Sequence, residues 1–351
     1  MGWWKECLPF AAMVLVQLGY AGMNIFSKAA MDSGMTPYVL VTYRQIFATA
    51  AIAPFAFFLE RKIRPKMTRR VLYQSIFCSF FGATLNVFLY FVGLQYTTPT
   101  IACAADNTFP AITYIVGIFV GMEKLKIVER AGQAKVFGTV VCVGGAMVLS
   151  FYHGSLLRVP QSGIHWTFVE GTAEEGSGHH STFLGPLLVI RSCVSWAFWL
   201  MVQTKLSQNY PVPFTNTTLM CFWSIFPSAI VSVIVNHRPS DWSLKSPIRL
   251  VSVLYAAIVS SAVGFWLMSW VAGKRGPLYV SIFSPLLLVI VAVLSWGLLD
   301  EQLYVGTVLG SVLIVAGLYT VLWGKKEEIR EEAPKAGNVS TARSEEEGNG
   351  L

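Results

Sequence analysis

Apolar residues occur along this chain in runs of about 20, separated by short polar segments. A helix of that length crosses a hydrocarbon layer of roughly 30 Å, so each run is typical of a transmembrane helix. The pattern predicts an all-α integral membrane protein, and few residues remain for an aqueous domain. Ten spans are expected, at Leu8–Ala29, Tyr38–Leu59, Val71–Leu94, Ala102–Met122, Gln133–Phe151, Leu184–Leu206, Phe214–Val235, Leu250–Val271, Pro277–Leu299 and Val305–Trp323.

Similar residues recur in the two halves of the chain at nearly constant spacing. Pro99 and Pro277 each begin a span, and Glu123 and Glu301 end the same two spans. Because each half holds five spans, the second must enter the membrane from the opposite face, which predicts an inverted repeat. The expected parts are a first repeat at 8–152, a non-cytoplasmic linker at 153–182, a second repeat at 183–324, and a disordered cytoplasmic tail at 325–351.

Two pairs of glycines support this correspondence. Gly138 and Gly145 lie seven residues apart in the fifth span, and Gly310 and Gly317 have the same spacing in the tenth. Residues at this spacing share one face of a helix, and small faces allow close helix packing in lipid. The fifth and tenth spans are therefore expected to form a scaffold within the chain or the surface of a homodimer.

The distribution of charged residues predicts the orientation of the chain in the membrane and does not indicate a binding partner. Of the residues, 54% are hydrophobic and 13% charged, and the net charge is +7. Basic residues concentrate at 61–70, 124–135 and 325–335, which the ten spans place on one side of the membrane. Basic loops favour the cytoplasm, so both termini are expected there, and no nucleic-acid partner is indicated. The lipid bilayer is the expected surrounding.

Motifs for chemistry are not found in the sequence. The six cysteines form no Cys-x-x-Cys pair, and nucleotide-binding, metalloprotease and serine-hydrolase motifs do not occur. We therefore expect no cofactor and no metal site. An intramembrane enzyme is poorly supported, because no acid, base or metal set can be assembled.

The fourth and ninth spans each carry a proline inside an apolar run. A proline within a helix leaves the carbonyl four residues earlier without its amide donor. Pro110 would free the carbonyl of Asp106, next to Asn107, and Pro285 would free that of Ser281. Polar groups at this depth are tolerated where they face protein or a water-filled cavity. This pattern predicts a solute site between the third, fourth, eighth and ninth spans.

Further candidates come from polar and aromatic residues in the spans. Lys28 and Lys205 end the first and sixth spans, as interface anchors or as gates that contact an anionic substrate. Arg44 lies about two turns into the second span, where it can pair with Asp106 or extend to the headgroups, and its depth favours the headgroups. The other candidates for substrate binding are Asn24, Asn86, Tyr90, Tyr114, Trp270 and Ser284.

Several long segments resemble the plant WAT1-related family, which are nodulin-like transporters of the EamA type within the drug/metabolite transporter superfamily. The resemblance is carried by GLQYTTPTIACAADNTFPAITYIVG with MEKL, by KVFGTVVCVGGAMVLSFYHG, and by the run from KRGPLYVSIFSP to LYTVLWGK. It implies ten spans in two EamA repeats, with both termini cytoplasmic. It also implies transport of amino acids or, in some members, auxin, across the plasma or vacuolar membrane.

The resemblance also bears on single residues. The polar-plus-proline pattern of the family falls on Asn107 and Pro110 in the fourth span, and on Ser284 and Pro285 in the ninth. Similar proteins often have Asn-Pro at the second place and an uncharged residue at Asp106, so this chain departs from the pattern twice. The resulting prediction is a secondary transporter or facilitator that works by alternating access, for amino acids first and an auxin-like acid second. A receptor or scaffold that does not transport is the alternative.

Overall fold

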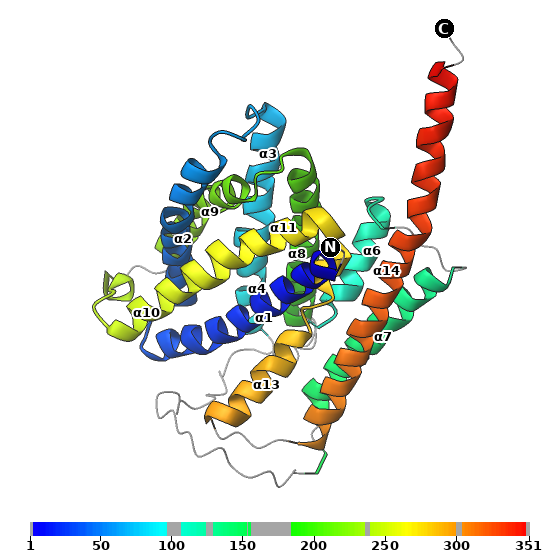
Figure 1. Ribbon diagram of the computed structural model, residues 1–351. Helices are drawn as coiled ribbons and strands as arrows, with labels where there is room; N and C mark the ends of the chain where they lie inside the picture. The colour runs from blue at the N-terminus through cyan, green and yellow to red at the C-terminus, as the bar shows by residue number, and fades with distance from the viewer. Residues whose placement is uncertain are drawn as a thin grey trace.

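The computed structural model describes residues 3–96, 107–123, 129–152, 154–155, 184–235, 239–299 and 304–348. In these residues the regular structure is helical, and no β-strand occurs among them (Figure 1). The elements are α1 Trp3–Asp32, α2 Pro37–Glu60, α3 Arg69–Cys78, η1 Ser79–Leu85, α4 Asn86–Gln95, α6 Phe109–Phe119, α7 Arg130–Phe151, α8 Leu184–Asn209, α9 Pro213–Val235, η2 Pro239–Trp242, α10 Pro247–Tyr255, η3 Ala256–Gly264, α11 Phe265–Arg275, α12 Pro277–Ser281, α13 Leu286–Leu299 and α14 Val305–Gly348.

Eight helical runs in the described residues are long and apolar enough to cross a membrane. They lie at eight of the ten predicted spans. At the predicted fourth and ninth spans the described apolar helices are shorter, Phe109–Phe119 and Pro277–Val291. The runs at the third and eighth predicted spans each contain a π-helical segment, η1 and η3, which begin 177 residues apart at Ser79 and Ala256.

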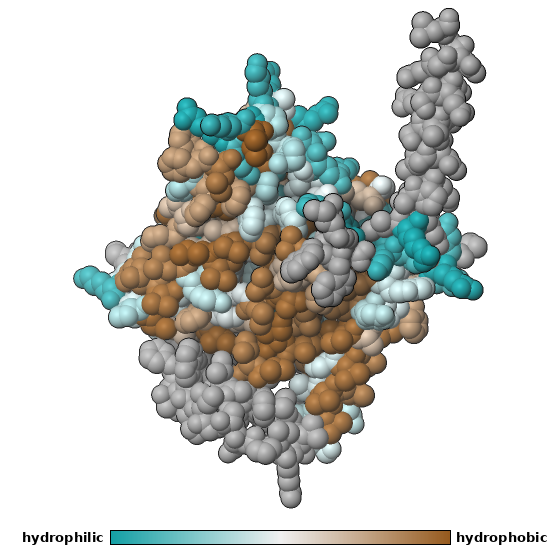
Figure 2. Space-filling model, viewed as in Figure 1, coloured by the Kyte–Doolittle hydropathy of each residue, from teal (hydrophilic) through white to brown (hydrophobic). Residues whose placement is uncertain are grey.

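The outer surface of the helix bundle is apolar. Phe119 is 86% exposed, Phe58 78% and Tyr319 71%, which is the opposite of the arrangement in a protein surrounded by water. Figure 2 shows hydrophobic residues in a broad belt across the visible face, with hydrophilic residues gathered toward the upper end. A contiguous apolar belt of this extent faces lipid.

Helices α2 and α9 occupy equivalent places in the two halves and pack side by side. Thr42 near the start of α2 shares a hydrogen bond of 2.8 Å with Ser232 near the end of α9. Glu60 at the end of α2 accepts hydrogen bonds from the amides of Phe214 and Thr215 at the start of α9, at 2.9 and 2.6 Å. The two helices therefore run antiparallel.

The second equivalent pair, α7 and α14, meets through the predicted glycines. A Cβ atom added at Gly138 would lie 2.8 Å from the carbonyl oxygen of Gly317, and one at Gly145 would lie 3.0 Å from that of Gly310. This pairing confirms close packing of the two glycine faces, and it shows that α7 and α14 are also antiparallel. The four glycines therefore cover one another within the chain, as the scaffold alternative expects, and the possible homodimer stays a prediction.

The segment predicted to be a disordered tail differs in the structure. Helix α14 does not end near Trp323 but continues to Gly348. Lys325 and Glu328 in this extension belong to a buried cluster of four charges, completed by Glu123 after α6 and Lys135 in α7. Composition alone predicts that the charged residues of this segment are exposed to water. Lys325 and Glu328 are instead partnered by these ion pairs. The linker predicted at 153–182 lies outside the described residues, except for Gly154 and Ser155.

Candidate functional site

The ninth span is broken where the sequence predicts. Helix α12 ends at Ser281, four residues form successive turns, and α13 begins at Leu286 directly after Pro285. Pro285 is buried and has no amide hydrogen to continue the helix. The carbonyl of Ser281 is nevertheless not free, since it accepts the amide of Ser284 at 3.0 Å. The prediction of an exposed Ser281 carbonyl is wrong, because the chain tightens into a three-residue turn at the break.

The fourth span is arranged differently from its prediction. Helix α6 begins at Phe109, so Pro110 lies in the first turn rather than at a kink in the helix interior. A proline is favoured there because the amide that it lacks has no partner within the helix. Asp106 and its carbonyl lie outside the described residues. Helix α6 packs against α12, so the two proline-containing segments lie side by side as expected.

Asn107 is buried just before α6. Its Nδ2 donates to Ser150 Oγ on α7 at 3.3 Å, so part of its side chain joins two helices of the first half. Ser281 is fully buried, and its hydroxyl donates to the carbonyl of Leu278 at 3.0 Å. Ser284 is half-buried, and no described residue accepts a hydrogen bond from its hydroxyl.

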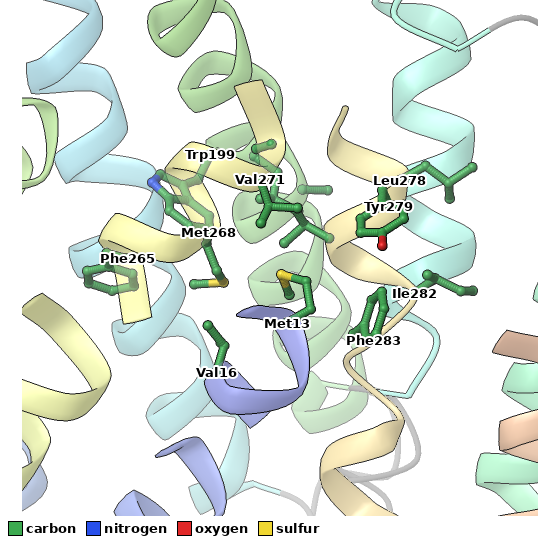
Figure 3. Packing of buried hydrophobic residues seen from close by; sticks show 14 of the residues in the cluster. Met13, Val16, Trp199, Phe265, Met268, Val271, Leu278, Tyr279, Ile282 and Phe283 are labelled. Carbon is green, nitrogen blue, oxygen red and sulfur yellow. The ribbon is translucent and has the colours of Figure 1, made fainter. Parts of the chain in front are cut away.

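Apolar side chains fill the region between α1, α8, α11 and α12. Figure 3 shows Met13 of α1, Met268 of α11 and Phe283 of the turn after α12 lying in one cluster. The Phe283 ring is fully buried, and its centroid lies 5.5 Å from that of Phe10 on α1. The buried side chains of Ile282 and Phe283 lie among apolar neighbours, so the region beside the break is filled by apolar contacts.

Two further candidates, Asn86 and Trp270, have defined side-chain contacts. Asn86, at the start of α4, donates Nδ2 to the carbonyl and the hydroxyl of Ser192 on α8, at 3.0 and 3.3 Å. Trp270 on α11 lies with its ring 4.2 Å from the Nζ of Lys274, one turn further along the same helix. Asn86 therefore joins the two halves, and Trp270 forms a cation–π contact near the end of its span.

The remaining candidates differ in burial. Asn24 on α1 and Lys205 on α8 are exposed, Tyr90 is half-buried, and the side chain of Lys28 lies outside the described ones. The Tyr114 ring is buried with Lys135 Nζ 5.8 Å from its centroid, and its hydroxyl has no described hydrogen-bond partner. A shared role of these residues in substrate binding stays a prediction.

The Arg44 side chain points into the helix bundle. Its Nε donates to Ser261 Oγ on η3, its Nη1 donates to Met23 Sδ on α1 at 3.4 Å, and its guanidinium lies 5.6 Å from the Phe265 ring centroid on α11. The prediction that Arg44 extends to the headgroups is wrong, because its face of α2 packs against other helices. Sequence reasoning missed Ser261, although a Ser-Ser pair within an apolar span is a usable signal.

Comparison with known proteins identifies the family of this chain. The model of the EamA-like transporter family matches the chain twice, over residues 9–151 and 183–323. The chain belongs to the EamA-like transporter family. Three WAT1-related proteins of Arabidopsis thaliana are 39%, 36% and 37% identical to it, over 91%, 93% and 93% of this chain and 81%, 86% and 86% of their own lengths. A solved crystal structure shares the fold, with a TM-score of 0.64 and 19% identity over 90% of this chain and 96% of its own.

Family membership and the apolar belt make this protein a multi-pass membrane transporter of the WAT1-related group and not an enzyme. The first EamA match includes α1 to α7, and the second includes the helices from α8 into α14. Arg44 and Ser261 therefore come from different EamA copies. Their contact, together with that of α6 and α12, joins the copies inside the bundle.

Proposed function

We propose that this EamA-like protein is a secondary transporter or facilitator that moves small organic solutes by alternating access. Amino acids are the first substrate class proposed and an auxin-like indole acid the second. The resemblance to WAT1-related proteins supports these classes. The broken ninth helix and the buried polar residues around the junction of the copies support a solute path inside the bundle.

The observation that carries this proposal is the direction of the equivalent helices. Helices α2 and α9 run antiparallel, and so do α7 and α14. If the two EamA copies pointed the same way, equivalent helices would run parallel. Two inverted copies of five spans, ten in total, account for both pairs. Such copies exchange conformations as the site opens to alternate faces.

In the proposed cycle, the apolar contacts around Phe283 form a closed barrier. Opening the path requires α1 to separate from the turn after α12, which breaks the contact between Phe10 and Phe283. The seam between α7 and α14 has backbone atoms in close approach and is proposed to remain closed. The copies would then rock about that seam.

Flux through purified protein tests the proposed function. The full chain is reconstituted into liposomes and offered radiolabelled amino acids and indole-3-acetate, with and without a pH gradient. Uptake that saturates with concentration supports the proposal, and a dependence on the gradient would indicate proton coupling. If no member of the panel enters faster than into protein-free liposomes, the proposal is refuted.

Matched variants test the residues at the helix junction. Asn107→Ala and Ser150→Ala remove the same hydrogen bond from opposite sides. If Asn107 contacts solute, its variant loses flux while Ser150→Ala retains most of it. Equal effects would assign Asn107 a packing role. Ser284→Ala tests the Ser284 hydroxyl, which has no described partner, in the same assay.

Orientation and membrane of residence are proposed as well. Both termini are proposed to face the cytoplasm, in the plasma membrane or the vacuolar membrane. Single cysteines introduced at Lys62 and Ser243 in a cysteine-free background should react with impermeant reagents from opposite sides. Reaction of both from the same side would overturn the inverted topology. A fluorescent fusion imaged in plant cells distinguishes the two membranes.

A further inference from the structure

Arg44 carries a positive charge inside the bundle that no described acidic side chain balances. It lies seven residues past Pro37, about 10 Å along the α2 axis, at 1.5 Å per residue. Its hydrogen-bond partners are the hydroxyl of Ser261 and the sulfur of Met23, and both are neutral. The ionisable side chains that interact with it electrostatically are those of Tyr20 and Cys221.

The Arg44 guanidinium has N–H groups that donate to no described residue. Arginine carries five N–H donors, and two of those of Arg44 are used. The other three have no acceptor among the described residues. The hydroxyl of Tyr20 on α1 is also buried without a described partner. An unbalanced charge and unmatched donors inside a membrane protein are costly, and such residues typically mark a substrate path.

We infer that Arg44 and Tyr20 bind the carboxylate of the transported solute, and that Ser261 holds the guanidinium in position. The inference rests on the proposed function, because it assigns a chemical class to the solute of that path. A planar guanidinium binds a carboxylate through two parallel hydrogen bonds. The Tyr20 hydroxyl supplies a further donor from the neighbouring helix.

The location fits a solute handled by both halves. Arg44 and Tyr20 belong to the first EamA copy, while Ser261 belongs to the π-helical segment η3 of the second. A π-helical segment is frequent at functional sites because it displaces backbone and side chains from regular α geometry. A carboxylate bound at Arg44 would therefore lie at a junction whose two sides move relative to each other during transport.

Equilibrium binding to the purified full-length protein tests this site. The probes are the common L-amino acids and indole-3-acetate, each compared with its own carboxamide, which is uncharged at that end. Measurements are made in detergent, once without lipid and once with added phosphatidylglycerol, since a lipid phosphate has related oxyanion chemistry. We expect at least one carboxylate to bind, and its carboxamide to bind at least about 30-fold more weakly.

Variants then assign the effect to Arg44. Arg44→Gln should weaken carboxylate binding about 30-fold or more, and Tyr20→Phe should weaken it several-fold. Arg44→Lys keeps the charge without the planar fork and should fall between wild type and Arg44→Gln. Arg191→Gln is the matched control, because Arg191 is an exposed arginine on α8. The Arg191→Gln variant should bind the carboxylate with wild-type affinity.

Several results would overturn the inference. The inference is wrong if Arg44→Gln binds the carboxylate with wild-type affinity, or if carboxylates and carboxamides bind equally well. It is also wrong if the wild type binds no carboxylate, or if phosphatidylglycerol is the one probe whose binding depends on Arg44. If Arg44→Gln does not fold, Arg44→Lys and Tyr20→Phe decide, and wild-type affinity in both overturns it. Carboxylate binding without flux in liposomes would refute the proposed transport and leave this site standing.

Discussion

The glycine seam between α7 and α14 allows a controlled test of how the two EamA copies are held together. Gly144 and Gly145 are neighbours on α7, yet their surroundings differ. A Cβ atom at Gly145 would lie 2.6 Å from Leu313 Cβ and 2.8 Å from the amide nitrogen of Ile314, while one at Gly144 would meet nothing within 4 Å. Alanine at the two positions therefore separates steric conflict from helix propensity.

The magnitude follows from the contacts. Carbon atoms pack at about 3.5–4.0 Å, so a Cβ at Gly145 requires α14 to move by about 1 Å. Overpacking of this kind costs about 1–3 kcal/mol. The gain in helix propensity from glycine to alanine, up to about 1 kcal/mol in water, applies to both positions and cancels in the comparison. Gly145→Ala is thus expected to be about 1–3 kcal/mol less stable than Gly144→Ala.

Thermal unfolding in detergent measures the difference, with size-exclusion chromatography as the readout of intact protein. At about 2.1 cal/mol/K of unfolding entropy per residue, a loss of 1 kcal/mol lowers the Tm of this 351-residue chain by about 1–2 °C, so Gly145→Ala should unfold about 1–4 °C below Gly144→Ala. Equal Tm values for the two variants would refute the close approach of α7 and α14, and with it one of the two antiparallel pairs.

Three further outcomes are expected. Glu60→Gln should lower stability by about 1.5–3 kcal/mol, seen as a lower Tm, because the Glu60 carboxylate accepts two amides and the Thr215 hydroxyl at the start of α9. Lys135→Met should cost about 3–5 kcal/mol in the same assay, since it leaves buried Glu328 with a reduced set of partners, whereas Lys135→Arg should retain most of the stability. Asn216 should carry no glycan despite its Asn-Thr-Thr sequence, because it is fully buried and donates to the Tyr210 carbonyl, and a mobility shift on endoglycosidase treatment that Asn216→Gln abolishes would contradict this burial.

The spans and the break in the ninth helix could be predicted because their causes are local. Apolar length sets a membrane helix, and Pro285 lacks its amide wherever the chain is placed. The glycine spacing predicted a helix–helix contact for the same reason. It did not identify the partner face, since Gly145 and Gly310 come together only when the two copies pack.

The errors concern properties that depend on the surroundings. Pro110 lies in the first turn of α6 because Asn107 and Thr108 form a turn outside that helix, which a proline alone does not indicate. The Ser281 carbonyl accepts a different amide, and this depends on the geometry of one turn. Arg44 extends inward because of how α2 is rotated in the bundle, and depth along a helix carries no information on rotation. Lys135 and Glu328 are 193 residues apart, so their ion pair could not be read from spacing.

The paired π-helical segments bear on the history of the chain. Each is an energetically unfavourable departure from α geometry, and the two begin 177 residues apart in equivalent spans of the EamA copies. Two independent insertions at matching depth are a less economical explanation than one. A single irregularity, present in one EamA unit before that unit was duplicated, would account for both segments.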